Sequence, residues 1–178
     1  MTTPAQTIGP FFAFGLEYDG NSSLVPPGSP GAIRLHGRVL DGAGEPVPDA
    51  LVELWQTDPD GRVVRQPGSL HRDGHTFTGW GRAATDRAGT YSFTTLTPGG
   101  SPDGPTYFAL AVFARGLLDR LFTRAYLPGQ PDDRLLTSLD AAQRATLVAK
   151  EDPQGYRFDI VLQGDGETVF LDHRRTQD

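Results

Sequence analysis

Apolar and polar residues alternate along much of the chain with the two-residue period of a half-buried β-strand. In residues 33–39 one face is apolar and the other polar, formed respectively by Ile33, Leu35, Gly37 and Val39 and by Arg34, His36 and Arg38. Residues 50–57 are apolar on both faces, which predicts a central strand. Further strands are predicted at residues 76–85, 90–96, 106–114, 121–127, 156–163 and 168–172. Seven or eight short strands separated by Gly, Pro and Asp turns predict an all-β fold, a β-sandwich.

Two segments depart from this alternation. Residues 1–30 are rich in Thr, Gly, Pro and Ser and carry three Phe residues without a regular period, which predicts an extended arm. Each Phe is worth roughly 1.5–3 kcal/mol when buried, so the arm is expected to lie on this domain or on a partner. Residues 139–149 predict one short helix, capped by Thr137 or Ser138 and supported by an Asp140–Arg144 pair. The chain is expected to form a single domain over residues 1–178, with its core in residues 31–178.

Composition narrows the range of functions and partners that this chain could have. The net charge of −6 argues against a nucleic-acid partner, because such partners are bound mainly by clustered Lys and Arg. No apolar run approaches the ~20 residues that span a bilayer, and no basic-then-apolar leader opens the chain, so a cytoplasmic protein without membrane contact is expected. The chain has no Cys, so any metal would need His, Tyr or carboxylate ligands.

The four His residues provide weak metal-site candidates. His71 and His75 have the spacing of a zinc pair on a helix, but the intervening residues 72–74 are turn-like. An exposed loop is therefore the favoured interpretation of this pair, and metal-dependent catalysis through it is the less favoured one. His36 lies on the polar side of its strand and His173 in a charged tail, so both are expected to be solvated.

Other catalytic patterns are equally weak. The carboxylate pairs Asp58/Asp60 and Asp132/Asp133 lie among Pro and Gly residues, where Asp commonly stabilises turns. No Gly-x-Ser-x-Gly elbow occurs, and the single Lys, Lys150, belongs to no phosphate-binding loop. The residues alone therefore predict a β-sandwich without an assigned activity.

Several short motifs occur in order along nearly the whole chain. They are TIGPFF at 7–12, LWQ at 54–56, GR at 61–62, GRAATD at 81–86, GTYSF at 89–93, LTPG at 96–99, RGL at 115–117 and RAYL at 124–127. Together they resemble the intradiol ring-cleavage dioxygenases. That resemblance implies a β-sandwich and chemistry at a non-haem ferric ion, held by two Tyr and two His, that opens a catechol ring with dioxygen.

The resemblance also locates the four ligand positions. They are occupied here by Val63, Ser101, Tyr107 and Ala109. Residues i and i+2 of a strand share a face, as a His-x-His pair requires, and Tyr107 and Ala109 have that spacing. Val and Ala have no metal-donor atom and Ser is a poor ligand, so this chain is expected to bind no metal.

Loss of the ligands alongside retention of the other motifs resembles the α-type subunit of a two-subunit member of the family. The implied partner is a homologous β subunit that holds Fe(III) and shares a site for protocatechuate and dioxygen. The residues implied to contact the substrate at the α/β interface are Thr7, Gly9, Pro10 and Arg124. No catalytic residue is expected in this chain alone. The alternative is a stand-alone β-sandwich that serves as a binding or scaffold module.

Overall fold

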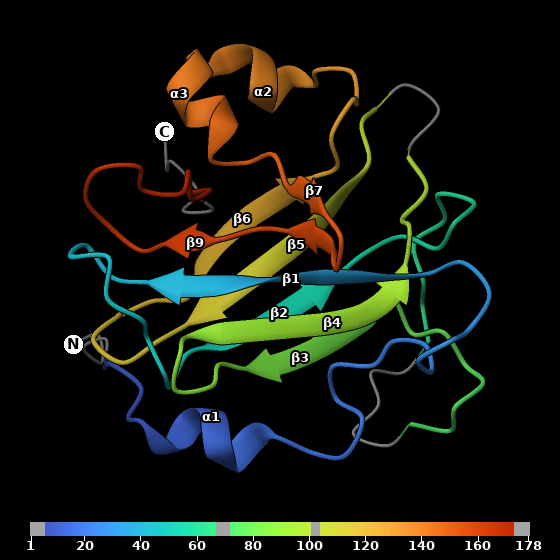
Figure 1. The fold of residues 1–178 in the computed structure, drawn as a ribbon, viewed down its shortest axis with the longest axis horizontal. Helices are drawn as coiled ribbons and strands as arrows, with labels where there is room; N and C mark the ends of the chain where they lie inside the picture. The colour runs from blue at the N-terminus through green and yellow to red at the C-terminus, as the bar shows by residue number, and fades with distance from the viewer. Residues whose placement is uncertain (1–5, 67–71, 101–103, 173–178) are drawn as a thin grey trace, which may run out of the picture.

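The computed structural model describes residues 6–66, 72–100 and 104–172, which form two stacked β-sheets (Figure 1). The first sheet has the order β4-β1-β8-β7, with β9 also paired to β1, and the second has the order β3-β2-β5-β6. The strands are β1 Ala32–Leu40, β2 Leu51–Trp55, β3 Trp80–Ala84, β4 Thr90–Leu96, β5 Tyr107–Phe113, β6 Leu121–Tyr126, β7 Lys150–Asp152, β8 Gly155–Arg157 and β9 Ile160–Val161. The predicted all-β sandwich is confirmed.

Strand β1 is the centre of the first sheet. It pairs antiparallel with β4 over seven residue pairs and parallel with β8 and β9. Leu35 and Val39 are fully buried on its inner face, as the alternation predicts, and Phe93 of β4 pairs with Leu35. Apolar side chains at every second position thus place one face of this sheet against the core.

Strand β2 is the corresponding central strand of the second sheet, between β3 and β5. Val52 and Leu54 are fully buried in the core. On the opposite face, Glu53 accepts hydrogen bonds from Arg82 Nη2 at 2.7 Å and Nε at 3.2 Å. The inner face of β2 is therefore buried and its outer face partly exposed, and its place between β3 and β5 confirms the prediction of a central strand.

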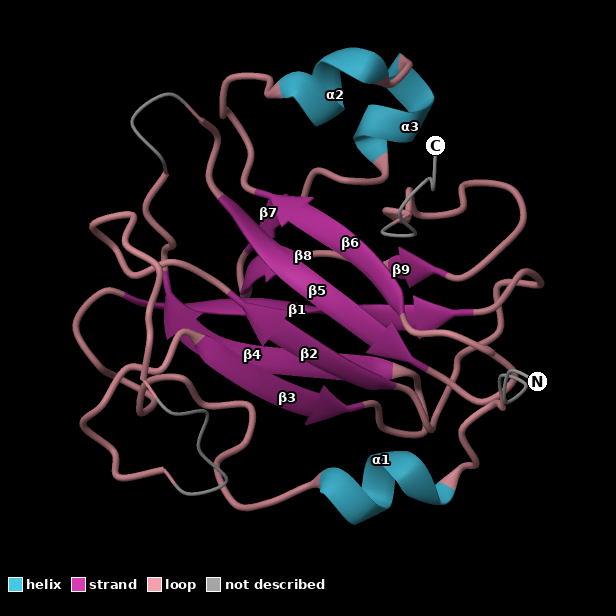
Figure 2. Cartoon of the chain, turned by 180° about the vertical axis from the view of Figure 1, so that it is seen from behind, coloured by secondary structure: helices cyan, strands magenta, loops and turns pink. Residues whose placement is uncertain are grey.

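The N-terminal arm is not extended throughout, because residues Phe11–Leu16 form helix α1. Figure 2 shows this helix beside the β3 edge of the second sheet. The Phe12 ring lies 5.4 Å from that of Phe113, and Ala13 is buried. A helix of six residues has little stability in isolation, so packing against the sheet stabilises α1. The hydrophobic periodicity of the sequence therefore did not predict this helix.

A helix occurs within the predicted range of residues 139–149, but it is shorter than predicted, α3 at Ala141–Ala145. A second helix, α2 at Arg134–Ser138, precedes it and was not predicted. The predicted cap is wrong, since neither Thr137 nor Ser138 is an N-cap. Asp140, expected to pair with Arg144, instead caps α3 through a capping box with Gln143.

The chain leaves the helical conformation after α3 because its backbone pairs with β6. Tyr126 N–H donates to the Leu147 carbonyl at 2.8 Å, and Ala149 N–H donates to the Tyr126 carbonyl at 2.9 Å. These hydrogen bonds with a distant strand satisfy the same backbone groups that a longer helix would have used, and they therefore end the helix early.

The C-terminal strands also differ from the prediction. Residues 156–163 divide into β8 and β9, and residues 168–172 form no strand, although Leu171 N–H donates to the Phe122 carbonyl at 2.7 Å. Of the helices in the described part of the chain, none is long and apolar enough to cross a membrane.

Candidate functional site

The outer face of the second sheet carries two of the positions implied for iron ligands. Tyr107 and Ala109 are partly exposed there, while Phe108 between them is fully buried in the core. In the strand register, Trp55 of β2 and Arg124 of β6 lie on either side of Ala109. The expected shared face of Tyr107 and Ala109 is present, and Arg124 lies beside it.

The residues at the implied ligand positions do not fit a ferric ion. Val63 has an apolar side chain that is 71% exposed, and Ala109 offers only a methyl group. The ring of Tyr107 is covered by the Arg124 guanidinium, whose central carbon lies 4.3 Å from the ring centroid. A fixed cation on the remaining phenol would repel a metal cation. Ser101 lies outside the described residues.

A cleft of about 440 Å³ lies over this part of the sheet, and we call it the sheet cleft. Ala109 and Ala111 are among its small residues, and Trp55, Tyr107 and Phe122 among its aromatic ones. The Trp55 side chain is 51% exposed. The cleft therefore presents an apolar, aromatic surface, with Arg124 as one of its few charged groups.

Arg124 is held by three side chains. Its Nη1 donates to Tyr126 Oη at 3.1 Å and to Asp133 Oδ2 at 3.1 Å, and Tyr126 Oη donates to the same Asp133 oxygen at 2.8 Å. The guanidinium carbon lies over the Tyr107 ring, and the centroids of the Tyr107 and Tyr126 rings are 5.4 Å apart. We call Arg124, Asp133, Tyr126 and Tyr107 the arginine cluster.

The protonation states of the arginine cluster follow from burial and charge. Burial lowers the pKa of Arg124, but its hydrogen bond to Tyr126 and the neighbouring phenol and carboxylate groups outweigh this and leave the pKa raised. Burial raises the pKa of Tyr126 to about 12, against the lowering effect of Arg124. Arg124 therefore stays cationic and Tyr126 stays a neutral donor near pH 7, an arrangement that can bind an anionic group.

The three arm residues implied to contact substrate lie at the end of the β5–β6 hairpin. Thr7 Oγ1 accepts a hydrogen bond from the Gly116 N–H at 2.7 Å. The Gly9 carbonyl accepts from the Phe12 N–H at 3.1 Å, and Pro10 is the N-cap residue of α1. A Cβ atom built on Gly9 would meet no atom within 4 Å, so this stretch of backbone is open to a partner.

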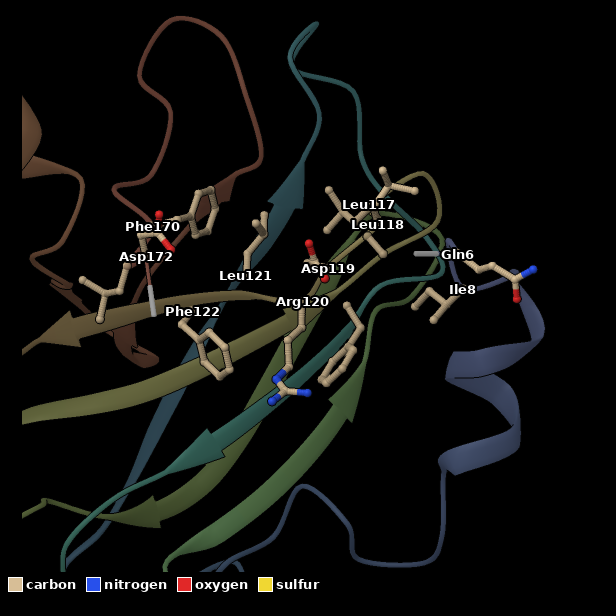
Figure 3. Close-up of a pocket in the computed structure, with 13 residues that line it drawn as sticks. Gln6, Ile8, Leu117, Leu118, Asp119, Arg120, Leu121, Phe122, Phe170 and Asp172 are labelled. Carbon is tan, nitrogen blue, oxygen red and sulfur yellow. The ribbon is translucent and has the colours of Figure 1, made fainter. Parts of the chain in front are cut away.

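A second cleft, of about 780 Å³, separates the arm from the β5–β6 loop (Figure 3). Gln6 and Ile8 line it from the arm, and Leu117 and Leu118 from the loop. Figure 3 shows Arg120 alongside Phe122, and the guanidinium carbon lies 5.0 Å from the ring centroid. The arm is held beside the hairpin by the Thr7 hydrogen bond and by the packing of Phe12 on Phe113.

The structure does not bring the arm residues and Arg124 together. Arg124 is opposite Ala109, whereas Thr7 contacts Gly116 beyond the far end of β5. At roughly 3.3 Å per residue, the part of β5 from Ala109 to Phe113 alone is about 13 Å long. The arm residues and Arg124 are therefore separate parts of the surface.

Of the four His candidates the structure describes two, His36 and His75, and neither of these lies in a metal site. His75 lies in an exposed loop in which its N–H donates to Asp73 Oδ1 at 2.8 Å, and His71 and His173 lie outside the described residues. His36, expected to be solvated, is instead buried, with Nε2 3.2 Å from Asp152 Oδ1. Strand β7 supplies that carboxylate, and no pattern in the sequence predicted β7. No group of three or more potential metal-ligating His, Asp or Glu residues occurs among the described residues.

Nothing in the sequence indicated that Asp133 and Tyr126 belong to the arginine cluster. Asp133 was expected only to stabilise a turn, and its Oδ1 does accept from the Leu136 N–H at 2.9 Å at the start of α2. Its second oxygen binds Arg124 and Tyr126. An acidic residue two positions after Pro131 predicts a helix cap, but nothing local predicts its contact with β6.

The chain belongs to the intradiol dioxygenase family, since residues 9–164 match the family model described as dioxygenase, and this family uses non-haem iron. The protocatechuate 3,4-dioxygenase alpha chain of Burkholderia cepacia is 38% identical, over 96% of both chains. The beta chain from the same organism is 34% identical, over 90% of this chain and 75% of that relative. A solved dioxygenase domain from Streptomyces sp. SirexAA-E has a TM-score of 0.58 at 27% identity, covering 91% of this chain and 98% of that one.

Proposed function

We propose that this chain is the α subunit of a cytoplasmic protocatechuate 3,4-dioxygenase. With a homologous β subunit that binds Fe(III), it would convert protocatechuate and dioxygen to 3-carboxy-cis,cis-muconate. The observation that carries the proposal is the near full-length similarity to an alpha chain. Val63 and Ala109, which have no donor atom, support it at two of the positions that the resemblance implies for iron ligands. The chain would complete a site whose metal chemistry belongs to its partner.

Within that assembly we assign different tasks to the two groups of predicted substrate contacts. The arm residues Thr7, Gly9 and Pro10 would cover the partner's site, since Gly lets backbone approach a ligand closely and Pro limits the direction of the arm. Arg124 would bind the substrate carboxylate, because a guanidinium matches a carboxylate with two parallel hydrogen bonds.

The first test separates this chain from its partner. Purified alone, the chain is expected to contain no stoichiometric iron and to show no ring cleavage. Co-expressed with the homologous β subunit, it is expected to co-purify in a complex that contains iron and consumes dioxygen with protocatechuate. Iron analysis and oxygen uptake measure both results. Iron and activity in the lone chain would overturn the proposal, and a stable monomer that ignores the partner would favour a scaffold module.

A second prediction concerns the exposed face of α1. Phe11 and Phe14 are 81% and 67% exposed, while Phe12 packs on the chain's own sheet. Exposed aromatic rings on one face of a helix are typical of an interface. Replacing Phe11 and Phe14 with Ser is expected to weaken α/β association by roughly 100-fold or more, since each buried Phe contributes about 1.5–3 kcal/mol.

Analytical ultracentrifugation of the complex, with thermal unfolding of each variant, measures this effect. The matched control is Phe12→Ser, which is expected to destabilise the packing of α1 on its own sheet, because the Phe12 ring contacts Phe113. An unchanged association constant for the Phe11/Phe14 double variant would show that these rings do not contact the partner.

A further inference from the structure

The carboxylate of Asp133 divides its two oxygens between two different tasks. Oδ1 caps helix α2 by accepting from the Leu136 N–H, which is a purely local role. Oδ2 accepts from Arg124 Nη1 at 3.1 Å and from Tyr126 Oη at 2.8 Å. The second oxygen therefore links the start of α2 to the guanidinium that borders the sheet cleft.

The hydrogen bonds to Asp133 and Tyr126 determine which edge of the Arg124 guanidinium is available to bind a ligand. Both hydrogen bonds of the guanidinium use Nη1, and no described residue accepts from its Nε or Nη2. The guanidinium carbon lies over the Tyr107 ring, 4.3 Å from its centroid, and this contact restricts movement of the side chain on that side. A guanidinium held at one corner and on one face presents its remaining Nε–Nη2 edge in a single orientation, and this edge suits a bidentate carboxylate.

We infer that Asp133 and Tyr126 are positioning residues that orient Arg124 toward the carboxylate of a carboxylated catechol. The inference rests on the proposed function and deepens it, because it assigns substrate selectivity to a network rather than to one arginine. Asp133 would act through Arg124 and would not touch the substrate itself.

A purely electrostatic role for Asp133 gives the opposite expectation. The Asp133 charge offsets the charge of Arg124, so if it acted only in this way, its removal would strengthen the attraction of an anionic substrate. If it acts by positioning, its removal lets the guanidinium turn away and weakens the same contact. The sign of the effect therefore distinguishes the two roles.

The test uses the assembled α/β complex with Asp133→Asn, since Asn retains the ability to cap α2. We expect kcat/KM for protocatechuate to fall roughly tenfold, mainly through KM, because misplacing one binding group is costly even when the group itself remains. Turnover of catechol, which lacks the carboxylate, is expected to change less than about twofold. Tyr126→Phe, which removes only the hydroxyl, is expected to shift the ratio of the two substrates in the same direction.

Asp132→Asn is the matched control. It makes the same charge change one residue away, where the carboxylate pairs with Arg144 at 2.5 Å instead of with Arg124. An unchanged or increased preference for protocatechuate in both Asp133→Asn and Tyr126→Phe would overturn the inference, as would an equal loss in Asp132→Asn. Should Asp133→Asn fail to assemble, Tyr126→Phe alone decides between these outcomes.

The same experiment separates this inference from the proposed function. A wild-type complex that does not cleave protocatechuate would overturn the proposed function and the inference with it. An active complex in which Arg124→Ala alters selectivity, while the Asp133 and Tyr126 variants do not, would leave the proposed function standing and remove only the positioning role.

Discussion

Replacing Arg124 with Ala is expected to lower kcat/KM for protocatechuate by roughly 10- to 150-fold in the assembled enzyme. A hydrogen bond to a charged group contributes about 1.5–3 kcal/mol, and each 1.4 kcal/mol corresponds to a factor of about ten. Catechol has no carboxylate, so its turnover is expected to change little. Steady-state kinetics with both substrates, on complexes of verified iron content, measure the difference.

The fall in kcat/KM for protocatechuate in Arg124→Ala should be independent of pH across the neutral range. The pKa of Arg124 is raised, so the guanidinium is already fully protonated at neutral pH and no titration of this group adds to the effect. Arg157→Ala provides a matched control, because Arg157 lies on β8 of the other sheet, pairs with Asp159 and does not line the sheet cleft. An equal loss for both substrates in Arg124→Ala would mean that Arg124 is a structural residue.

Replacing Gly37 with Ala is expected to lower the free energy of unfolding by about 3 kcal/mol or more. A Cβ at this position would lie 1.8 Å from the Phe158 carbonyl oxygen and 2.5 Å from its carbon. Phe158 cannot easily move away, because its N–H donates to the His36 carbonyl at 2.7 Å and its carbonyl accepts from the Tyr91 hydroxyl at 2.6 Å. Overpacking against a fixed backbone usually costs about 1–3 kcal/mol and occasionally more.

Thermal unfolding followed by circular dichroism measures this effect, which corresponds to a fall in Tm of roughly 6–12 °C for a domain of this size. Gly15→Ala is the matched control, since a Cβ there meets no atom within 4 Å and the residue lies in helix α1. It is expected to leave stability unchanged or to raise it by up to about 1 kcal/mol. Equal Tm values for the two variants would contradict the close approach of β1 and Phe158.

Strands with a clear local pattern were predicted well. The alternation of Leu35 and Val39 with polar neighbours predicted β1, and the two apolar faces of β2 predicted its central place. Helices were predicted poorly. The run of helix-forming residues after Leu139 stops at Ala145, because the following backbone pairs with Tyr126, which is far away along the chain.

The sequence by itself determined the chemistry at the positions that the family resemblance implies for iron ligands. Val63 and Ala109, at two of these positions, have no donor atom in any conformation, so neither side chain could hold a metal. Only the tertiary structure decided what lies beside Tyr107 and Ala109: Arg124 lies over the Tyr107 ring and is held by Asp133 and Tyr126. Side chains from β5, β6 and the start of α2 meet there through strand register and helix placement, which long-range packing sets and local sequence patterns do not encode.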